Sequence, residues 1–103
     1  MTVWITQETQ HDIRAAEKFG DVDFVTDKDY LSLPNSVTND RLSAGLQRAA
    51  NAVAREDWIV PIGSPYVSMV FCAMVYKRLG VLRVLRWSNR DACYYPLELG
   101  RTA

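Results

Sequence analysis

Apolar and polar positions fall into blocks along the chain that predict strands and helices in turn. Short β-favouring runs at 2–6, 21–26 and 81–87 are typical of strands. The run 58–62 is apolar at nearly every position, which is typical of a central parallel strand covered on both faces. Residues 92–99 alternate after a turn-forming segment, so they predict a hairpin with 81–87.

Three stretches between these runs have helical spacing. The first is a short helix that Thr9 or Asp12 caps and that Gly20 ends. The second, from 38–56, carries an apolar stripe with arginines on a neighbouring face. The third, from 65–79, ends with basic residues and a glycine, both favoured at a helix C-terminus.

The order βαβαβαββ predicts one α/β domain spanning residues 1–103. We expect a small Rossmann-like three-layer sandwich with a mainly parallel five-stranded sheet in the order 2-1-3-4-5. Pro96 cannot donate a backbone hydrogen bond, which places the last strand at an edge, antiparallel to its neighbour.

The third helix is apolar around almost its whole circumference. Between Tyr66 and Tyr76 only Ser68 is clearly polar, which predicts burial on more than the side facing the sheet. Either a neighbouring helix covers the extra apolar surface, or a second copy of the chain does. The second hypothesis predicts a homo-oligomer interface through Val67, Val70, Phe71 and Met74.

Composition and charge exclude several classes of partner. The 103 residues contain 12 basic and 12 acidic side chains, so bulk charge does not favour nucleic acid or an anionic membrane. The two halves differ: residues 1–57 carry −4 and residues 58–103 carry +4, a charge dipole compatible both with steering an anionic ligand toward the second half and with attraction between copies of the chain. The apolar part of the third helix is shorter than the ~20 residues that cross a bilayer. The first ten residues lack the pattern of a signal peptide, so we expect a cytoplasmic location.

A strand-to-helix turn is the best candidate binding site. Gly63 ends the apolar run, Ser64 is a favoured N-cap residue and Pro65 suits the first helical position. Free amides at such a turn lie at the carboxyl end of the sheet, where α/β proteins bind anions. Alternatively, the turn only starts a helix. The residues expected to contact a ligand are Thr6, Gln7, Gly63, Ser64, Pro65, Tyr66, Arg86 and Arg90.

Residues for catalysis or metal binding are sparse. Neither GxGxxG nor GxxxxGK[ST] is present, and we interpret the only histidine, His11, as a surface residue. Cys72 and Cys93 are too few for a metal cluster. We therefore expect no catalytic residues, no metal and no cofactor.

Three segments carry a resemblance: KFGDVDFV, DWIVPIGSP and GVLRVLRWSNRDACYYPLEL. They resemble short, mostly uncharacterised proteins encoded by phages and prophages. The resemblance implies a small Rossmann-like protein of viral origin and carries no activity. Ser64 and Ser88 stand where acidic residues are more usual in that group.

Two functions follow from these observations. The first is a non-enzymatic, oligomeric protein that binds a nucleotide or another anionic ligand at the turn and sequesters a defence signal in the host cytoplasm. The alternative is an interaction module without a small ligand, which inhibits a host protein through the segment 27–37 or the third helix.

Overall fold

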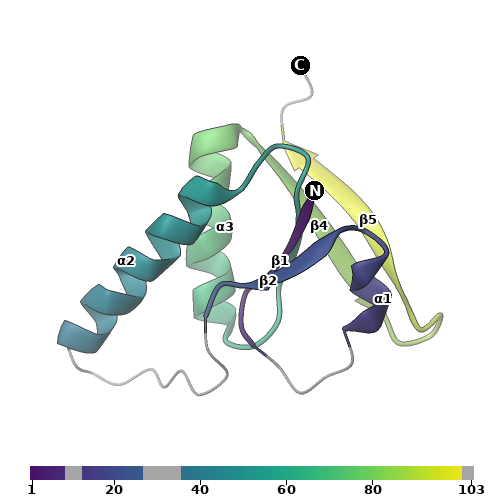
Figure 1. Ribbon diagram of the computed structural model, residues 1–103, viewed down its shortest axis with the longest axis horizontal. Helices are drawn as coiled ribbons and strands as arrows, with labels where there is room; N and C mark the ends of the chain where they lie inside the picture. The colour runs from purple at the N-terminus through teal and green to yellow at the C-terminus, as the bar shows by residue number, and fades with distance from the viewer. Residues whose placement is uncertain (9–12, 27–35, 101–103) are drawn as a thin grey trace.

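The computed structural model describes residues 1–8, 13–26 and 36–100, and of residues 36–39 it describes only the backbone. The predicted partner segment is 27–37, and its residues 27–35 lie outside the described part of the chain. His11 also lies outside it. The elements, in chain order, are β1 Thr2–Ile5, α1 Arg14–Glu17, β2 Asp21–Phe24, α2 Ser36–Ala52, β3 Trp58–Val60, α3 Pro65–Leu79, β4 Val81–Ser88 and β5 Cys93–Gly100 (Figure 1).

The strands form one sheet in the order β2-β1-β3-β4-β5. β4 and β5 are antiparallel, and the other neighbouring strands are parallel. The predicted α/β class and the predicted strand order are therefore confirmed. Helices α2 and α3 lie on one side of the sheet and α1 lies on the other (Figure 1).

Successive residues of the central strands supply two apolar cores because side chains alternate between the faces of a strand. Trp4 and Ile59 pack under α2 and α3, together with Phe71, which has no exposed surface. On the opposite face, Val3 and Ile5 pack with Ala16 of α1. Since α1 has only four residues, the second face has much less helical cover than the first.

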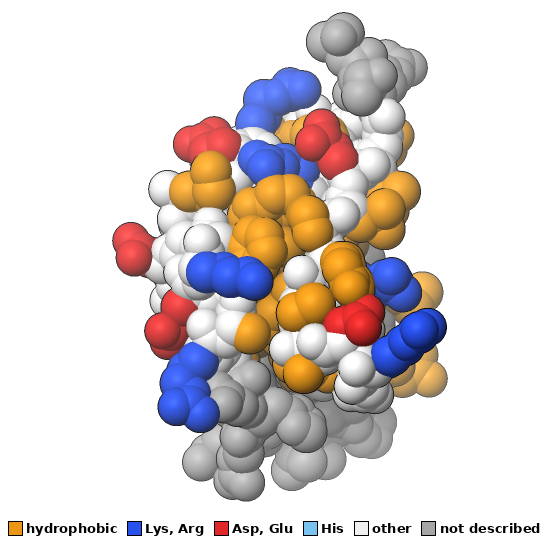
Figure 2. Space-filling view, turned by 90° about the vertical axis from the view of Figure 1, so that its right-hand side faces the viewer, with side chains coloured by type: hydrophobic (Ala, Val, Ile, Leu, Met, Phe, Trp, Pro, Cys, Tyr) orange, Lys and Arg blue, Asp and Glu red, His pale blue; other side chains and the backbone are white. Residues whose placement is uncertain are grey.

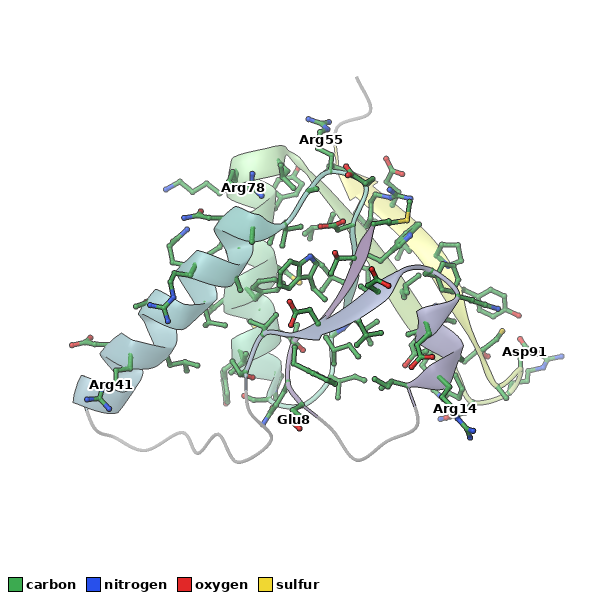
Figure 3. All side chains as sticks on the ribbon, in the orientation of Figure 1. Glu8, Arg14, Arg41, Arg55, Arg78 and Asp91 are labelled. Atoms are coloured by element: carbon green, nitrogen blue, oxygen red, sulfur yellow. The ribbon has the colours of Figure 1, made fainter. Side chains whose placement is uncertain are left out.

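Helix α2 is shorter at its end than predicted, and α3 holds that end in place. The guanidinium of Arg78 donates from Nε to the carbonyl of Ala50 at 3.2 Å, and from Nη2 to the carbonyls of Ala50 and Val53 (Figure 3). The carbonyl of Ala50 belongs to the last turn of α2 and that of Val53 lies just beyond its end, where intrahelical donors run out. Arg78 therefore caps α2 and ties it to α3.

The carboxylate of Asp57, which sequence reasoning missed, joins three parts of the chain. It is 6% exposed and accepts hydrogen bonds from the amide of Thr2 at 2.8 Å, Nε1 of Trp4 at 3.0 Å and the amide of Ala54 at 2.8 Å. The bond to Ala54 gives that amide a partner outside the helix, consistent with the end of α2 at Ala52. Burial of Asp57 by itself raises its pKa, but the bonds from Ala54, Trp4 and Thr2 outweigh burial and lower it.

We expect Asp57→Asn to lower the free energy of unfolding by about 1–3 kcal/mol at pH 7, because a buried N–H loses a charged acceptor. The lowered native pKa means that the charge of Asp57 stabilises the fold above the unfolded-state pKa. This stabilisation is lost as the pH falls through the native pKa. Urea denaturation from pH 7 down to pH 2 should therefore show the two proteins converging in acid. Asp21→Asn, at an exposed position of β2, is the control and should change stability by less than about 0.5 kcal/mol. A gap of unchanged size at every pH would contradict this role.

Candidate functional site

The hydroxyl of Thr6 fixes the backbone just after β3. It accepts a hydrogen bond from the amide of Ile62 at 2.8 Å and donates to the carbonyl of the same residue at 2.7 Å. Oγ of Ser68, in the first turn of α3, lies 3.0 Å from the Thr6 hydroxyl. Thr6 has no exposed surface, whereas Ile62 and Ser68 are half-buried, so its hydroxyl joins the three residues at the border of the core.

The hydrogen bonds between Thr6 and Ile62 leave the sheet open between β3 and β4. Pro61 has no N–H for a ladder, and Ile62 is bonded to Thr6, so the chain after Val60 follows β1. The register between β3 and β4 consists of the single pair Ile59 and Val84, whereas β4 continues to Ser88. Beyond that pair, the edge of β4 that faces β3 therefore has no neighbouring strand within the described part of the chain.

The turn itself is already occupied by a side chain of the protein. Oε1 of Gln7 accepts the amide hydrogen of Ser64 at 2.7 Å. Gly63 has φ +89°, and a Cβ at this position would collide with the Gln7 side chain. Ser64 precedes α3 as predicted, but its side chain makes no capping hydrogen bond. An anion at the Ser64 amide would therefore have to displace Gln7.

A pocket of about 910 Å³ lies beside this turn. It lies where β3 ends and β4 runs on, and Ala15 of α1 contributes to its wall. Figure 2 shows the side of the molecule that carries α1 and the hairpin, with hydrophobic side chains gathered along its middle between charged ones. The lining residues are Ala15, Val60, Pro61, Ile62, Gly63, Val84, Leu85, Arg86, Trp87, Asn89, Ala92, Tyr94 and Leu97.

Two aromatic rings give the pocket its most specific surface. Trp87 and Tyr94 are cross-strand partners whose ring centroids lie 5.0 Å apart at 63°, an edge-to-face pair. Trp87 is 43% exposed, and its indole N–H donates to Oδ1 of Asn89 at 2.7 Å. The rings are therefore held in position while the Trp87 side chain remains accessible to a ligand.

The structure separates the predicted ligand residues into three groups. Gly63 and Arg86 line the pocket. Thr6, Gln7 and Ser64 instead hydrogen-bond around the turn. The remaining three, Pro65, Tyr66 and Arg90, are exposed.

Sequence reasoning missed Asn89 and Ala92 as lining residues. Both lie around the hairpin turn, whose approach to the segment after β3 has no signal in the local sequence. The hairpin end is ordered by Asp91, whose carboxylate accepts the hydroxyl hydrogen of Tyr95 at 2.6 Å (Figure 3). This bond raises the pKa of Tyr95 to about 12.

The predicted oligomer residues also divide into two groups. Val67 and Phe71 are 2% and 0% exposed and belong to the core beneath α3. Met74 is half-buried against that core, and Val70 is 44% exposed. The outward surface of α3 therefore consists largely of residues other than these four predicted interface residues.

The lining of the pocket has the composition of a binding site. Among the described residues that line it, Arg86 has the only charged side chain, and none carries a carboxylate, imidazole or thiol. In the described ranges no three histidine, cysteine or acidic side chains are grouped so that they could hold a metal ion. Apolar walls, two rings and one guanidinium suit a ligand with a planar ring and a negative charge.

Comparison with known proteins identifies a family. The family model described as Phage Pam3 gp32-like protein matches residues 1–101. No curated protein and no solved structure matches the chain. Among the described helices, none has the length and apolar character needed to cross a bilayer.

We expect Thr6→Val to lower the free energy of unfolding by about 1–3 kcal/mol, because the change keeps the shape but leaves partly buried backbone groups of Ile62 without this partner. Thr2→Val is the matched control, the same change at the start of β1, since the Thr2 hydroxyl makes no hydrogen bond within the part of the chain that the structure describes. Chemical denaturation of both variants measures the difference. Equal stability of the two variants would contradict the role assigned to the Thr6 hydroxyl.

Proposed function

This chain belongs to the Phage Pam3 gp32-like protein family, and from that premise we propose that it binds a small ligand with a planar ring and a negative charge. The nucleotide class fits this description. The observation that carries the proposal is the pocket of about 910 Å³ that combines the Trp87–Tyr94 pair with Arg86 beside the turn at Gly63. Its volume lies in the range of small-molecule sites, roughly 300–1,000 Å³.

A planar ring is favoured by the walls of the pocket. Val60, Ile62 and Leu85 supply apolar surface, and Trp87 offers a partly exposed ring. Stacking of a base on an aromatic side chain contributes roughly 1–3 kcal/mol. We therefore expect stacking of the ligand ring on Trp87 to contribute most of the binding free energy.

A negative charge is favoured by Arg86. In the described part of the chain its guanidinium forms no ion pair with a carboxylate; it lies 5.9 Å from the ring of Tyr95, its cross-strand partner. Residues 58–103 carry +4 overall, which attracts an anion to this half of the molecule. Arg90, exposed in the hairpin turn next to Asn89, adds a second cation near the pocket.

The biological use that we propose is sequestration. The described lining residues, apolar walls with two rings and one guanidinium, are suited to holding a nucleotide and include no acid–base pair for converting it. For a phage protein in the host cytoplasm, holding a signalling nucleotide would lower its free concentration and weaken a defence that depends on it. Placing the ligand in the pocket leaves the bond between Gln7 and Ser64 intact.

A second candidate function is inhibition of a host protein. The observation in its favour is the exposure of Tyr66 and Met69, which are 73% and 67% exposed on α3. Large apolar side chains that gather on a surface mark sites of protein interaction. This function needs no small ligand, so a ligand screen separates it from the first.

Thermal unfolding in the presence of nucleotides and cyclic nucleotides tests the first proposal. A nucleotide at about 100 times its Kd should add ~2.7 kcal/mol of stability. A nucleoside, which lacks the charge, and pyrophosphate, which lacks the ring, should each shift the melting temperature less than the complete nucleotide. We expect Trp87→Leu to weaken binding by about ten-fold to a hundred-fold, and Arg86→Gln to weaken it by about ten-fold, the loss of one charge-assisted contact.

Two control variants remove the same kinds of side chain elsewhere. Tyr66→Leu removes an exposed aromatic ring outside the pocket, and Arg48→Gln removes an exposed cation on α2. Arg48→Gln should bind as the parent protein does, and Tyr66→Leu should leave the affinity of the pocket unchanged when binding is measured by titration at a fixed temperature. The proposal fails if no nucleotide shifts the melting temperature, or if a shift is unchanged by Trp87→Leu.

A further inference from the structure

Helix α3 carries a second apolar stripe that faces away from the protein. Tyr66, Met69, Ala73 and Tyr76 follow one another at spacings of three, four and three residues. All four are exposed, with Tyr66 at 73%, Met69 at 67% and Tyr76 at 42%. Side chains at this spacing share one face of a helix, which is the pattern of a seam between two packed helices.

The outer stripe is separate from the stripe that holds α3 on the sheet. Val67, Phe71 and Val75 are at most 2% exposed and belong to the core shared with α2. At 100° per residue, the middle of the outer stripe lies about half a turn away from the middle of this inner stripe. Packing within the chain therefore leaves the outer stripe without cover from the described elements.

The order of residues in the outer stripe is self-complementary. If two α3 helices pack antiparallel with Phe71 at the centre, Met69 of one copy faces Ala73 of the other, and Tyr66 faces Tyr76. A long side chain then meets a short one, and two rings meet at each end. A two-fold dimer requires one patch to be complementary to itself, and this stripe satisfies that requirement.

We propose that a second copy of this chain covers the stripe, with the two α3 helices antiparallel. The charge nearest the stripe is compatible with this arrangement, because the two Lys77 side chains would lie at opposite ends of the helix pair. They would be about 18 Å apart along the helix axis, beyond the distance at which salt screens charges at physiological ionic strength.

Strand β5 extends the same surface. Tyr95, Leu97 and Leu99 are 41–47% exposed, and they alternate toward the side of the sheet that α3 covers. The ring of Tyr76 lies close to Gly100, which joins the helix surface to the strand surface. Together these side chains expose roughly 700 Å², near the ~800 Å² that each partner buries in a standard interface.

A charge-pairing experiment tests the dimer and its orientation. Light scattering on the unmodified protein at micromolar concentration should give twice the mass of one chain. Met69→Lys and Ala73→Glu should each give a monomer, because each places a charge in the apolar seam without a partner. Mixed in equal amounts, the two variants should form a dimer again, since the new lysine of one chain faces the new glutamate of the other.

Folding and position are controlled separately. Circular dichroism should show both variants folded, as expected for changes at exposed positions. Phe24→Lys, at a 38% exposed position of β2, should leave the dimer intact. A monomeric unmodified protein would overturn the proposal and leave the surface to another kind of partner. Dimers that persist in both single variants, or a mixture that stays monomeric, would also overturn it.

Discussion

The hydroxyl of Thr6 holds the amide and the carbonyl of Ile62 at the end of β1, and the shape of the carboxyl edge of the sheet depends on this contact. A chain leaving β3 would ordinarily continue beside β4. Here Pro61 cannot extend the ladder, and Thr6 satisfies both backbone groups of the next residue. One buried side chain therefore directs the chain toward β1, and beyond Val84 the edge of β4 that faces β3 has no neighbouring strand among the described residues.

The consequences of this opening reach both faces of the sheet. Since α1 is a single turn, it does not cover the end of the hairpin, and Trp87 stays 43% exposed beside Tyr94. The opening and the incomplete helical cover together produce the pocket. On the other face α2 and α3 form a closed layer over Trp4 and Ile59. The protein thus keeps a well-packed core under α2 and α3 and an accessible, mainly apolar cavity where β3 ends beside β4.

The fold could be predicted from the sequence because its signals are local. Apolar runs marked the strands, Gly80 marked the end of α3, and the order of elements limited the topology to few choices. The connections made by Asp57 and Gln7 could not be predicted, because each joins residues that are more than 50 positions apart in the sequence. Nothing in a local pattern shows from which distant amide a carboxylate or carboxamide will accept a hydrogen bond.

Helix α3 shows the same limit within one element. Val67 and Phe71 have helical spacing, and so do Tyr66, Met69 and Ala73, so hydropathy alone does not decide which stripe meets the sheet. Packing decides which stripe meets the sheet: Phe71 fills the core under α2, and the stripe on the opposite side of the helix is left outside. The pocket lies beside the predicted binding turn, and not at its amides, for a related reason. The turn at Gly63 was identified, but Gln7 occupies its amide, and the open volume lies one strand further along the sheet.

Amide hydrogen exchange followed by NMR tests the central claim, that Thr6 and Gln7 hold the turn and thereby open the sheet. Ile62 and Ser64 lie outside any strand, so only their bonds to Thr6 and Gln7 protect their amides. We predict slow exchange at both residues. We also predict that, of the successive amides of Arg86 and Trp87, the one facing β3 exchanges as fast as the exposed turn at Arg90. Fast exchange at Ile62 and Ser64, or protection of both Arg86 and Trp87, would contradict the account.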